Sequence, residues 1–149
     1  MVETDPPEDT GYADFWASVD VMVMGRHTYD SVLSFEPWPY AGKPLMVLTT
    51  RPTVAQHGET FFSGPLPDLI AQLRQQGYTR VYLDGGVVVR QGLAADLVTD
   101  MTLSWLPTLL GSGRPLFGSE VPESRWTLHA SRAFPSGLLQ ATYRRQPKK

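Results

Sequence analysis

The chain has 149 residues, of which 42% are hydrophobic and 19% are charged, and this composition predicts one folded domain with a sizeable core. Its formal net charge of −2 excludes a strongly basic nucleic-acid-binding protein. Because there is no cysteine, disulfides, thiolate metal sites and cysteine nucleophiles are excluded as well.

The two ends of the chain differ in composition from the rest. Residues 1–11 are polar and acidic and contain two prolines, so we expect a flexible lead-in there, whereas 146–149 form a short basic tail. The intervening residues, 12–145, are expected to form one domain. No apolar run approaches the roughly 18 residues needed to span a membrane, and the acidic start does not resemble a signal peptide. These features predict a cytoplasmic protein.

The first third of the chain predicts two helices separated by a strand. Apolar residues spaced by three and four predict a short amphipathic helix from Tyr12 to Val19. The continuous apolar run 21–24 predicts a strand that is buried on both faces, and the following residues, 26–33, are predicted to be helical. The stretch 34–44 is rich in proline and glycine and predicts a loop.

The middle of the chain continues this alternation. Its clearest helix begins with Pro65, carries leucine and isoleucine on one face, and is followed by Gly77. The patterns predict strands at 45–50, 60–62 and 80–83 and helices at 65–76 and 87–95.

The last third of the chain predicts strands only. Residues 97–110 are rich in threonine, leucine and tryptophan and are predicted to form one long strand that ends at Gly111. Residues 126–132 and 138–144 flank a short turn and predict a closing hairpin. The whole order of elements predicts an α/β fold: a mainly parallel central sheet with helices on both faces and an antiparallel edge at the C-terminal end.

Three of the predicted strand ends carry residues suited to ligand binding, since ligands of open α/β sheets lie outside the carboxyl ends of the strands. At the first, Gly25 lets the backbone approach a ligand closely, and Arg26 adds a positive charge where a helix begins. The hydroxyl of Thr28 can donate a hydrogen bond there. The alternative is an ordinary strand–helix turn.

The second strand end is Thr49–Thr50–Arg51. Two hydroxyls beside a guanidinium suit a phosphomonoester, because the guanidinium can bind two phosphate oxygens at once. The alternative is an arginine that is simply exposed to solvent.

The third strand end is Asp84–Gly85–Gly86–Val87. Paired glycines let the chain turn without side chains in the way and leave room for a flat or phosphorylated ligand beside the next helix. The alternative is a tight turn with no ligand.

Other nucleotide-binding and catalytic motifs are absent from the sequence. The stretch 111–115 follows a long predicted strand and ends in proline, so it is not the dinucleotide-binding fingerprint. There is no Walker loop and no Gly-x-Ser-x-Gly motif. No metal site is predicted, because the histidines lack metal-ligand spacing: His27, His57 and His129.

Several stretches resemble a known family. The sequence Met-Gly-Arg-His-Thr-Tyr-Asp-Ser-Val at 24–32 is similar to the strand–helix junction of dihydrofolate reductases. Four later stretches resemble the C-terminal reductase domain of the bifunctional deaminase–reductase of riboflavin synthesis and its stand-alone relatives: 84–86, Gln91, 97–100 and 106–117. The resemblance extends from Tyr12 to Tyr143 and implies the three-layer dihydrofolate-reductase-like fold.

The resemblance implies an NADPH-dependent reductase that transfers hydride to a pterin-like or ribosylaminopyrimidine-like heterocycle. By position, it implies that the cofactor phosphates face Gly25, Arg26, His27 and Thr28. It implies that the 2′-phosphate, which distinguishes NADPH from NADH, is selected by Thr49, Thr50 and Arg51. It also implies that the pyrophosphate and nicotinamide side is lined by Asp84, Gly85, Gly86, Val87 and Gln91.

Three further residues are candidates for the substrate side. Asp14 lies in the predicted first helix, roughly where dihydrofolate reductases place their acid, and can hold a pterin-like ring or relay a proton. The alternative is a solvated carboxylate favoured by the helix dipole. Trp38 and Tyr40 stand in the loop expected near the substrate, where they can stack on a flat heterocycle or pack on the rim of the sheet.

The sequence departs from the family pattern at its start. Family members begin with a central strand and a Ser-Leu-Asp-Gly-like turn, and nothing of that kind precedes Tyr12. We expect the neighbouring strands to have unpaired backbone groups unless another segment or another chain fills the gap. Pairing of 97–110 and of the hairpin across a two-fold axis would form a homodimer. The only other partner expected is the small heterocyclic substrate, with no nucleic acid and no membrane.

Two alternative functions are compatible with these motifs. One is a non-catalytic nucleotide-binding or dimeric scaffold domain that lacks the first strand of the fold. The other is NADPH-dependent reduction of a small carbonyl compound, which substrate screening would distinguish from reduction of a heterocycle.

Overall fold

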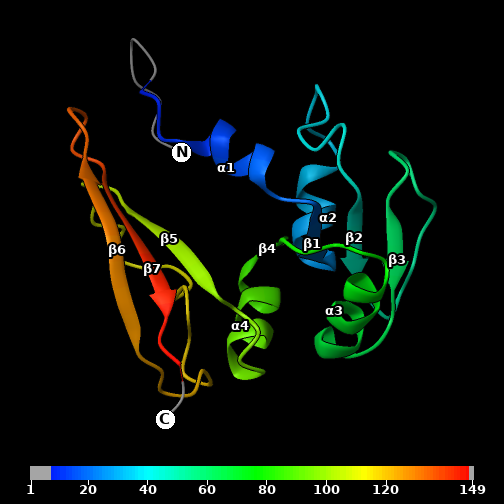
Figure 1. Ribbon diagram of the computed structural model, residues 1–149. Helices are drawn as coiled ribbons and strands as arrows, with labels where there is room; N and C mark the ends of the chain where they lie inside the picture. The colour runs from blue at the N-terminus through cyan, green and yellow to red at the C-terminus, as the bar shows by residue number, and fades with distance from the viewer. Residues whose placement is uncertain (1–7, 148–149) are drawn as a thin grey trace. The chain divides into compact units, whose positions relative to one another are not determined.

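The computed structural model describes residues 8–147, and these residues divide into two units. The first unit consists of residues 12–97, and the second consists of residues 8–11 and 98–147. Figure 1 shows the helices and strands of both units with the labels used below.

The first unit alternates helices with parallel strands, as the sequence predicts. Its sheet has the strand order β3–β2–β1–β4, and every neighbouring pair is parallel (Figure 1). The strands are β1 (Val21–Gly25), β2 (Leu45–Leu48), β3 (Thr60–Phe62) and β4 (Val81–Asp84). The helices are α1 (Tyr12–Ser18), α2 (Arg26–Val32), α3 (Leu66–Gln75) and α4 (Gly86–Ala94).

The strand β1 is buried because its side chains enter a core on each face of the sheet. On one face, Val21 and Val23 pack with leucines of α3 and with Val88 of α4. On the other face, Met22 and Met24 pack with side chains of α2 and α1. The run of apolar residues without alternation is what a strand covered on both faces requires. The predicted three-layer arrangement, with a parallel sheet between helices, is therefore confirmed.

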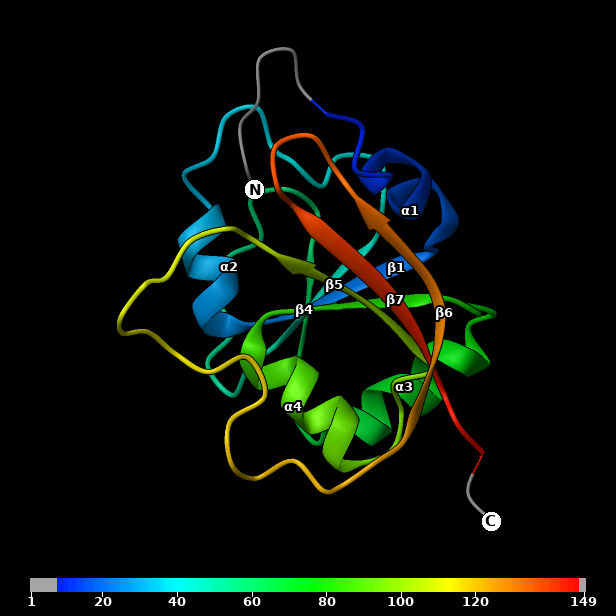
Figure 2. The ribbon, with the colours of Figure 1, turned by 90° about the vertical axis from the view of Figure 1, so that its left-hand side faces the viewer.

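The second unit contains three antiparallel strands in the order β5–β7–β6, which lie side by side in Figure 2. They are β5 (Asp100–Trp105), β6 (Trp126–Ala133) and β7 (Leu139–Arg145). β6 and β7 form the predicted hairpin, and at its turn the carboxylate of Glu8 accepts hydrogen bonds from the N–H and hydroxyl of Ser136 at 2.7 and 2.6 Å. The predicted combination of parallel and antiparallel strands is confirmed, with the antiparallel strands hydrogen-bonded in a sheet of their own.

The predicted long strand at 97–110 is wrong in its length. β5 ends at Trp105, which pairs with Leu139 at the beginning of β7. Pro107 follows and has no N–H for a ladder hydrogen bond. The N–H of Thr108 donates instead to the carbonyl of Leu106 at 2.8 Å, so the chain turns there. The other helices and strands differ from the prediction by one or two residues at their ends, where boundaries are least well defined.

Parts of the predicted lead-in (1–11) and basic tail (146–149) lie outside the described residues, which begin at residue 8 and end at residue 147. Within the lead-in, the N–H of Gly11 donates to the carboxylate of Asp9 at 2.9 Å. None of the helices at residues 8–147 combines the length and the apolar character that crossing a membrane requires.

The core assignment predicts that Leu69→Ala lowers the free energy of unfolding by about 2–5 kcal/mol, because it removes a fully buried side chain of α3 and leaves a cavity beside β1. Leu109→Ala is the matched control, since Leu109 is fully exposed and its loss should change the free energy by less than about 0.5 kcal/mol. Denaturant unfolding measures both values. Equal effects of the two substitutions would contradict the assigned core.

Candidate functional site

The parallel register brings the three predicted strand ends to one edge of the sheet. β1 lies between β2 and β4, with Gly25 opposite Leu48 and Met24 opposite Asp84. The residues that follow these strands therefore lie at the carboxyl edge of the first unit, where ligands of open α/β sheets bind. They are Arg26–Thr28, Thr49–Arg51 and Gly85–Val87.

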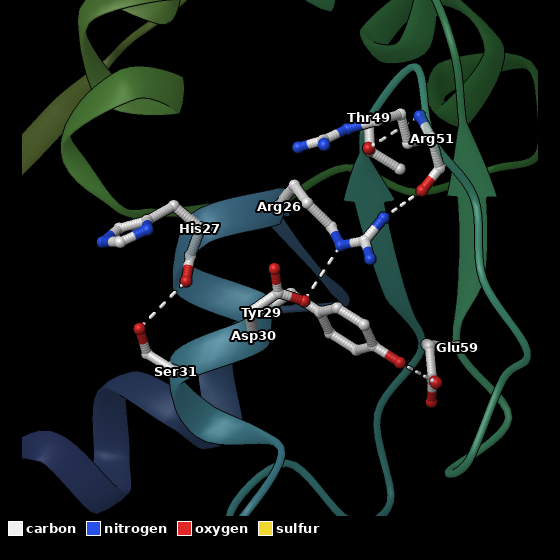
Figure 3. Close-up of polar contacts among 8 residues, drawn as sticks. All are labelled: Arg26, His27, Tyr29, Asp30, Ser31, Thr49, Arg51 and Glu59. Carbon is white, nitrogen blue, oxygen red and sulfur yellow. Dashed lines mark hydrogen bonds and ion pairs between the residues drawn. The ribbon is translucent and has the colours of Figure 1, made fainter.

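Arg26 links the first turn of α2 to the residues that follow β2 (Figure 3). Its Nε donates to the carboxylate of Asp30 at 2.9 Å, and another guanidinium nitrogen donates to the backbone carbonyl of Arg51. The hydroxyl of Thr49 accepts a hydrogen bond from the N–H of Arg51 at 3.0 Å. The backbone of Arg51 is thus held in place while its side chain remains exposed. An exposed guanidinium on a fixed turn suits an anionic ligand.

The turn after β4 requires glycine for two reasons. Gly85 has a φ of +100°, which L side chains rarely adopt, and a Cβ there would collide with the hydroxyl of Thr28. A Cβ on Gly86 would lie 2.9 Å from a guanidinium nitrogen of Arg90. Arg90 therefore folds back over the first turn of α4 and adds a positive charge where helix N–H groups lack intrahelical partners. Sequence analysis missed Arg90, although its position one helical turn after Gly86 is the signal that could have identified it.

Asp84 ends β4 and lies among tyrosine side chains. Burial raises the pKa of its carboxyl, although the N–H of Gly85 lowers it. Burial raises the pKa of Tyr40 to about 12 and also raises that of Tyr82, and the nearby Asp84 raises both further. Tyr12 is hydrogen-bonded to Tyr82, and burial raises its pKa as well. These shifts favour the protonated acid beside neutral phenols, which makes Asp84 a candidate proton donor.

Aromatic packing holds these phenols in place. Tyr82 meets Phe15 of α1 edge-on, with ring centroids 4.9 Å apart, and Tyr40 meets Trp38 edge-on at 5.3 Å. Trp38 in turn stacks on the imidazole of His57 at 3.9 Å, with the rings 7° from parallel. Of the two alternatives for Trp38 and Tyr40, packing within the protein is present in the structure, and Tyr40 also lies beside Asp84.

Other predicted site residues lie at the surface. Asp14 is exposed in the first turn of α1, as the alternative of a solvated carboxylate requires. The half-buried acid at the carboxyl edge of the sheet is Asp84 instead, and sequence analysis had placed that residue on the cofactor side. Four more predicted residues are exposed, and their roles stay predictions: His27, Thr50, Val87 and Gln91.

Comparison with known proteins identifies the family. The sequence profile of the RibD C-terminal domain matches residues 13–140. The chain belongs to this family. The uncharacterized protein YwjB of Bacillus subtilis (strain 168) is 31% identical to it over 129 residues, which cover 85% of this chain and 74% of YwjB.

Solved structures agree with this assignment of the fold. A candidate riboflavin biosynthesis protein from Shewanella sp. PV-4 is 37% identical and has a TM-score of 0.89, with 98% of this chain and 85% of that chain covered. Dihydrofolate reductase from Enterococcus faecalis, complexed with NADP(H), is 19% identical with a TM-score of 0.66 over 91% of this chain and 81% of its own. The predicted resemblance to the RibD C-terminal domain and the dihydrofolate-reductase-like fold are both confirmed. The RibD C-terminal domain family is of the reductase type.

The geometry of the β4 turn predicts that Gly85→Ala destabilises the domain more than Gly77→Ala. Both glycines have positive φ, of 100° and 92°, so a Cβ costs about 1–2 kcal/mol at each. Only at Gly85 does the Cβ also collide with Thr28, whereas nothing lies within 4 Å of a Cβ at Gly77. Thermal unfolding should show an additional loss of about 1 kcal/mol or more at Gly85. Equal losses would contradict the close approach of Thr28 to this turn.

Proposed function

We propose that this domain binds NADPH at the carboxyl edge of its parallel sheet and reduces a flat, nitrogen-containing heterocycle of the pterin-like or ribosylaminopyrimidine-like kind. The observation that carries the proposal is the distribution of charge along this edge. The guanidinium groups of Arg26 and Arg51 lie at the ends of β1 and β2, and the half-buried acid Asp84 lies among tyrosines at the end of β4. Membership in a reductase-type family supports the same function.

The residues present fit the cofactor. The exposed guanidinium of Arg51, on a turn fixed by Thr49, suits a phosphomonoester such as the 2′-phosphate of NADPH. Because Gly86 has no Cβ, the guanidinium of Arg90 can lie close to the first turn of α4, where a positive charge suits phosphate oxygens. The cofactor-binding residues under this proposal are those following β1, β2 and β4, with Arg90 added.

The remaining chemistry is proton delivery and substrate orientation. When bound, NADPH supplies a hydride to a C=N or C=O carbon. The matching proton must come from the protein or from water, and Asp84 is suited to hold it because burial favours its protonated form. The neutral hydroxyls of Tyr40 and Tyr82 can hydrogen-bond to ring nitrogens or amino groups of a heterocycle and so orient it.

The cofactor proposal predicts that Arg51→Ala weakens NADPH binding by about tenfold or more and leaves NADH binding nearly unchanged, because only NADPH carries the 2′-phosphate. The substitution keeps the backbone carbonyl that Arg26 binds, so the turn should persist. Fluorescence titration of both nucleotides measures the two dissociation constants.

Arg74→Ala, at an exposed arginine of α3, is the matched control and should change neither dissociation constant. Equal losses for NADPH and NADH in Arg51→Ala would contradict the role of Arg51, and failure of the wild-type protein to bind either nucleotide would contradict the proposed function.

The proton-donor proposal predicts that Asp84→Asn lowers kcat by about a hundredfold or more. Since the protonated acid is the donor, wild-type turnover should fall as the pH rises through the raised pKa of Asp84, and the variant should lack this fall. A raised pKa also means that the ionised carboxylate costs stability above that pKa, so the variant should unfold at no lower temperature at neutral pH. The measurement is the rate of NADPH oxidation with two substrates, dihydrofolate and the ribosylaminopyrimidine of riboflavin synthesis.

Asp14→Asn is the matched control for this experiment. Asp14 is an exposed acid of α1, and under the proposal its loss changes kcat by less than about twofold. A large loss in Asp14→Asn together with an active Asp84→Asn would reassign the proton donor to Asp14.

A further inference from the structure

Glu59 is the one charged side chain that is buried among the residues the structure describes, with 5% of its surface exposed. Its carboxylate accepts hydrogen bonds from the hydroxyl of Tyr29, from the N–H of Gln56 at 2.7 Å and from the N–H of His57 at 2.8 Å. Burial alone would raise the pKa of Glu59, but these hydrogen bonds outweigh it and hold the pKa below its ordinary value. A buried carboxylate is tolerated only with such partners, and the three donors and Glu59 form one hydrogen-bonded group.

The hydrogen bonds of Glu59 hold the C-terminal end of the segment that carries Arg51. The segment 49–59 connects β2 to β3, and Glu59 is its last residue. Tyr29, which binds Glu59, lies on α2 one helical turn after Arg26, which binds the carbonyl of Arg51 (Figure 3). The helix α2 therefore holds the segment near both of its ends. The stacking of Trp38 on His57 gives the segment a third contact, two residues before Glu59.

We propose that Glu59, acting through Tyr29, is a positioning residue that presets the segment 49–59 to receive the 2′-phosphate and so sets the preference for NADPH over NADH. The proposal rests on the proposed function. A loop that becomes ordered only when the ligand binds loses conformational entropy, and this loss weakens the affinity. A loop that is already ordered does not have this cost. NADH lacks the 2′-phosphate, so its binding does not depend on where the backbone of this segment places Arg51. Loss of the hydrogen bonds to Glu59 should therefore weaken the binding of NADPH more than that of NADH.

The selectivity separates a positioning role from a purely structural one. A residue that only stabilises the fold lowers the unfolding temperature and weakens both nucleotides to the same extent. A residue that positions Arg51 changes the ratio of the two dissociation constants. That ratio is the quantity to measure.

Two variants remove hydrogen bonds of Glu59 with little change in the shape of the substituted side chain. Tyr29→Phe deletes the hydroxyl that binds Glu59 and keeps the ring, which packs edge-on against Phe61 at 5.6 Å. Glu59→Gln replaces the carboxylate with an amide of the same size, whose single oxygen cannot take the place of both carboxylate oxygens, so at least one of the three hydrogen bonds is lost. Tyr78→Phe is the matched control, because Tyr78 packs in the other core cluster, away from α2.

Titration of the full chain with NADPH, NADH and 2′,5′-ADP tests the proposal, with the unfolding temperature of each variant measured alongside. We expect the NADPH-to-NADH affinity ratio to fall about tenfold in Tyr29→Phe and in Glu59→Gln, with 2′,5′-ADP weakened in parallel, and to stay unchanged in Tyr78→Phe. An unchanged ratio in both variants, with the wild-type protein selective for NADPH, would overturn this proposal alone. Absence of nucleotide binding by the wild-type protein would overturn it together with the proposed function.

Discussion

The register of β1 against its two neighbours is the constraint on which the first unit depends. Because β2, β1 and β4 are parallel and end in line, residues that are far apart in the sequence meet at one edge of the sheet. β1 can occupy this central place only because its side chains are apolar on both faces, with Val21 and Val23 against α3 and α4 and Met22 and Met24 against α2 and α1. A polar residue at any of these positions would be buried without a partner. The alignment of the strand ends, and with it the candidate site, therefore depends on the hydrophobic core.

At that edge, neighbouring strands end in residues with different chemical roles. The ends of β1 and β2 supply guanidinium groups and hydroxyls, and side chains of α2 bind the backbone carbonyl of Arg51 and the buried carboxylate of Glu59. The end of β4 supplies an acid whose pKa is raised by burial and phenols that aromatic contacts hold in place. Glycine at position 85 lets these two regions approach, because any side chain there would displace Thr28. A reductase needs both regions, one to bind the cofactor phosphates and one to manage the proton.

Local patterns in the sequence were sufficient for most of the fold. The helix that begins after Pro65 and the apolar strand at 21–24 have strong periodic or continuous patterns, and both lie where predicted. The strand predicted at 97–110 is wrong in its length because Pro107 has no N–H to continue the ladder, although the composition around it is typical of a strand. The site was foreseen at its three strand ends, but the pairing of Glu59 with Tyr29 joins residues 30 apart and leaves no periodic signal. Asp84 also lies near tyrosines from α1 and from the loop before β2, a neighbourhood that no local pattern reveals.

Amide hydrogen exchange of the full chain, with and without NADPH, tests most directly whether the aligned strand ends form the cofactor site. Slower exchange on NADPH binding is expected at residues that follow β1, β2 and β4, chiefly 26–28, 49–51 and 85–87, because the bound nucleotide would cover these segments. NADPH binding that slows exchange elsewhere in the chain and leaves these three segments unchanged would contradict this cofactor site.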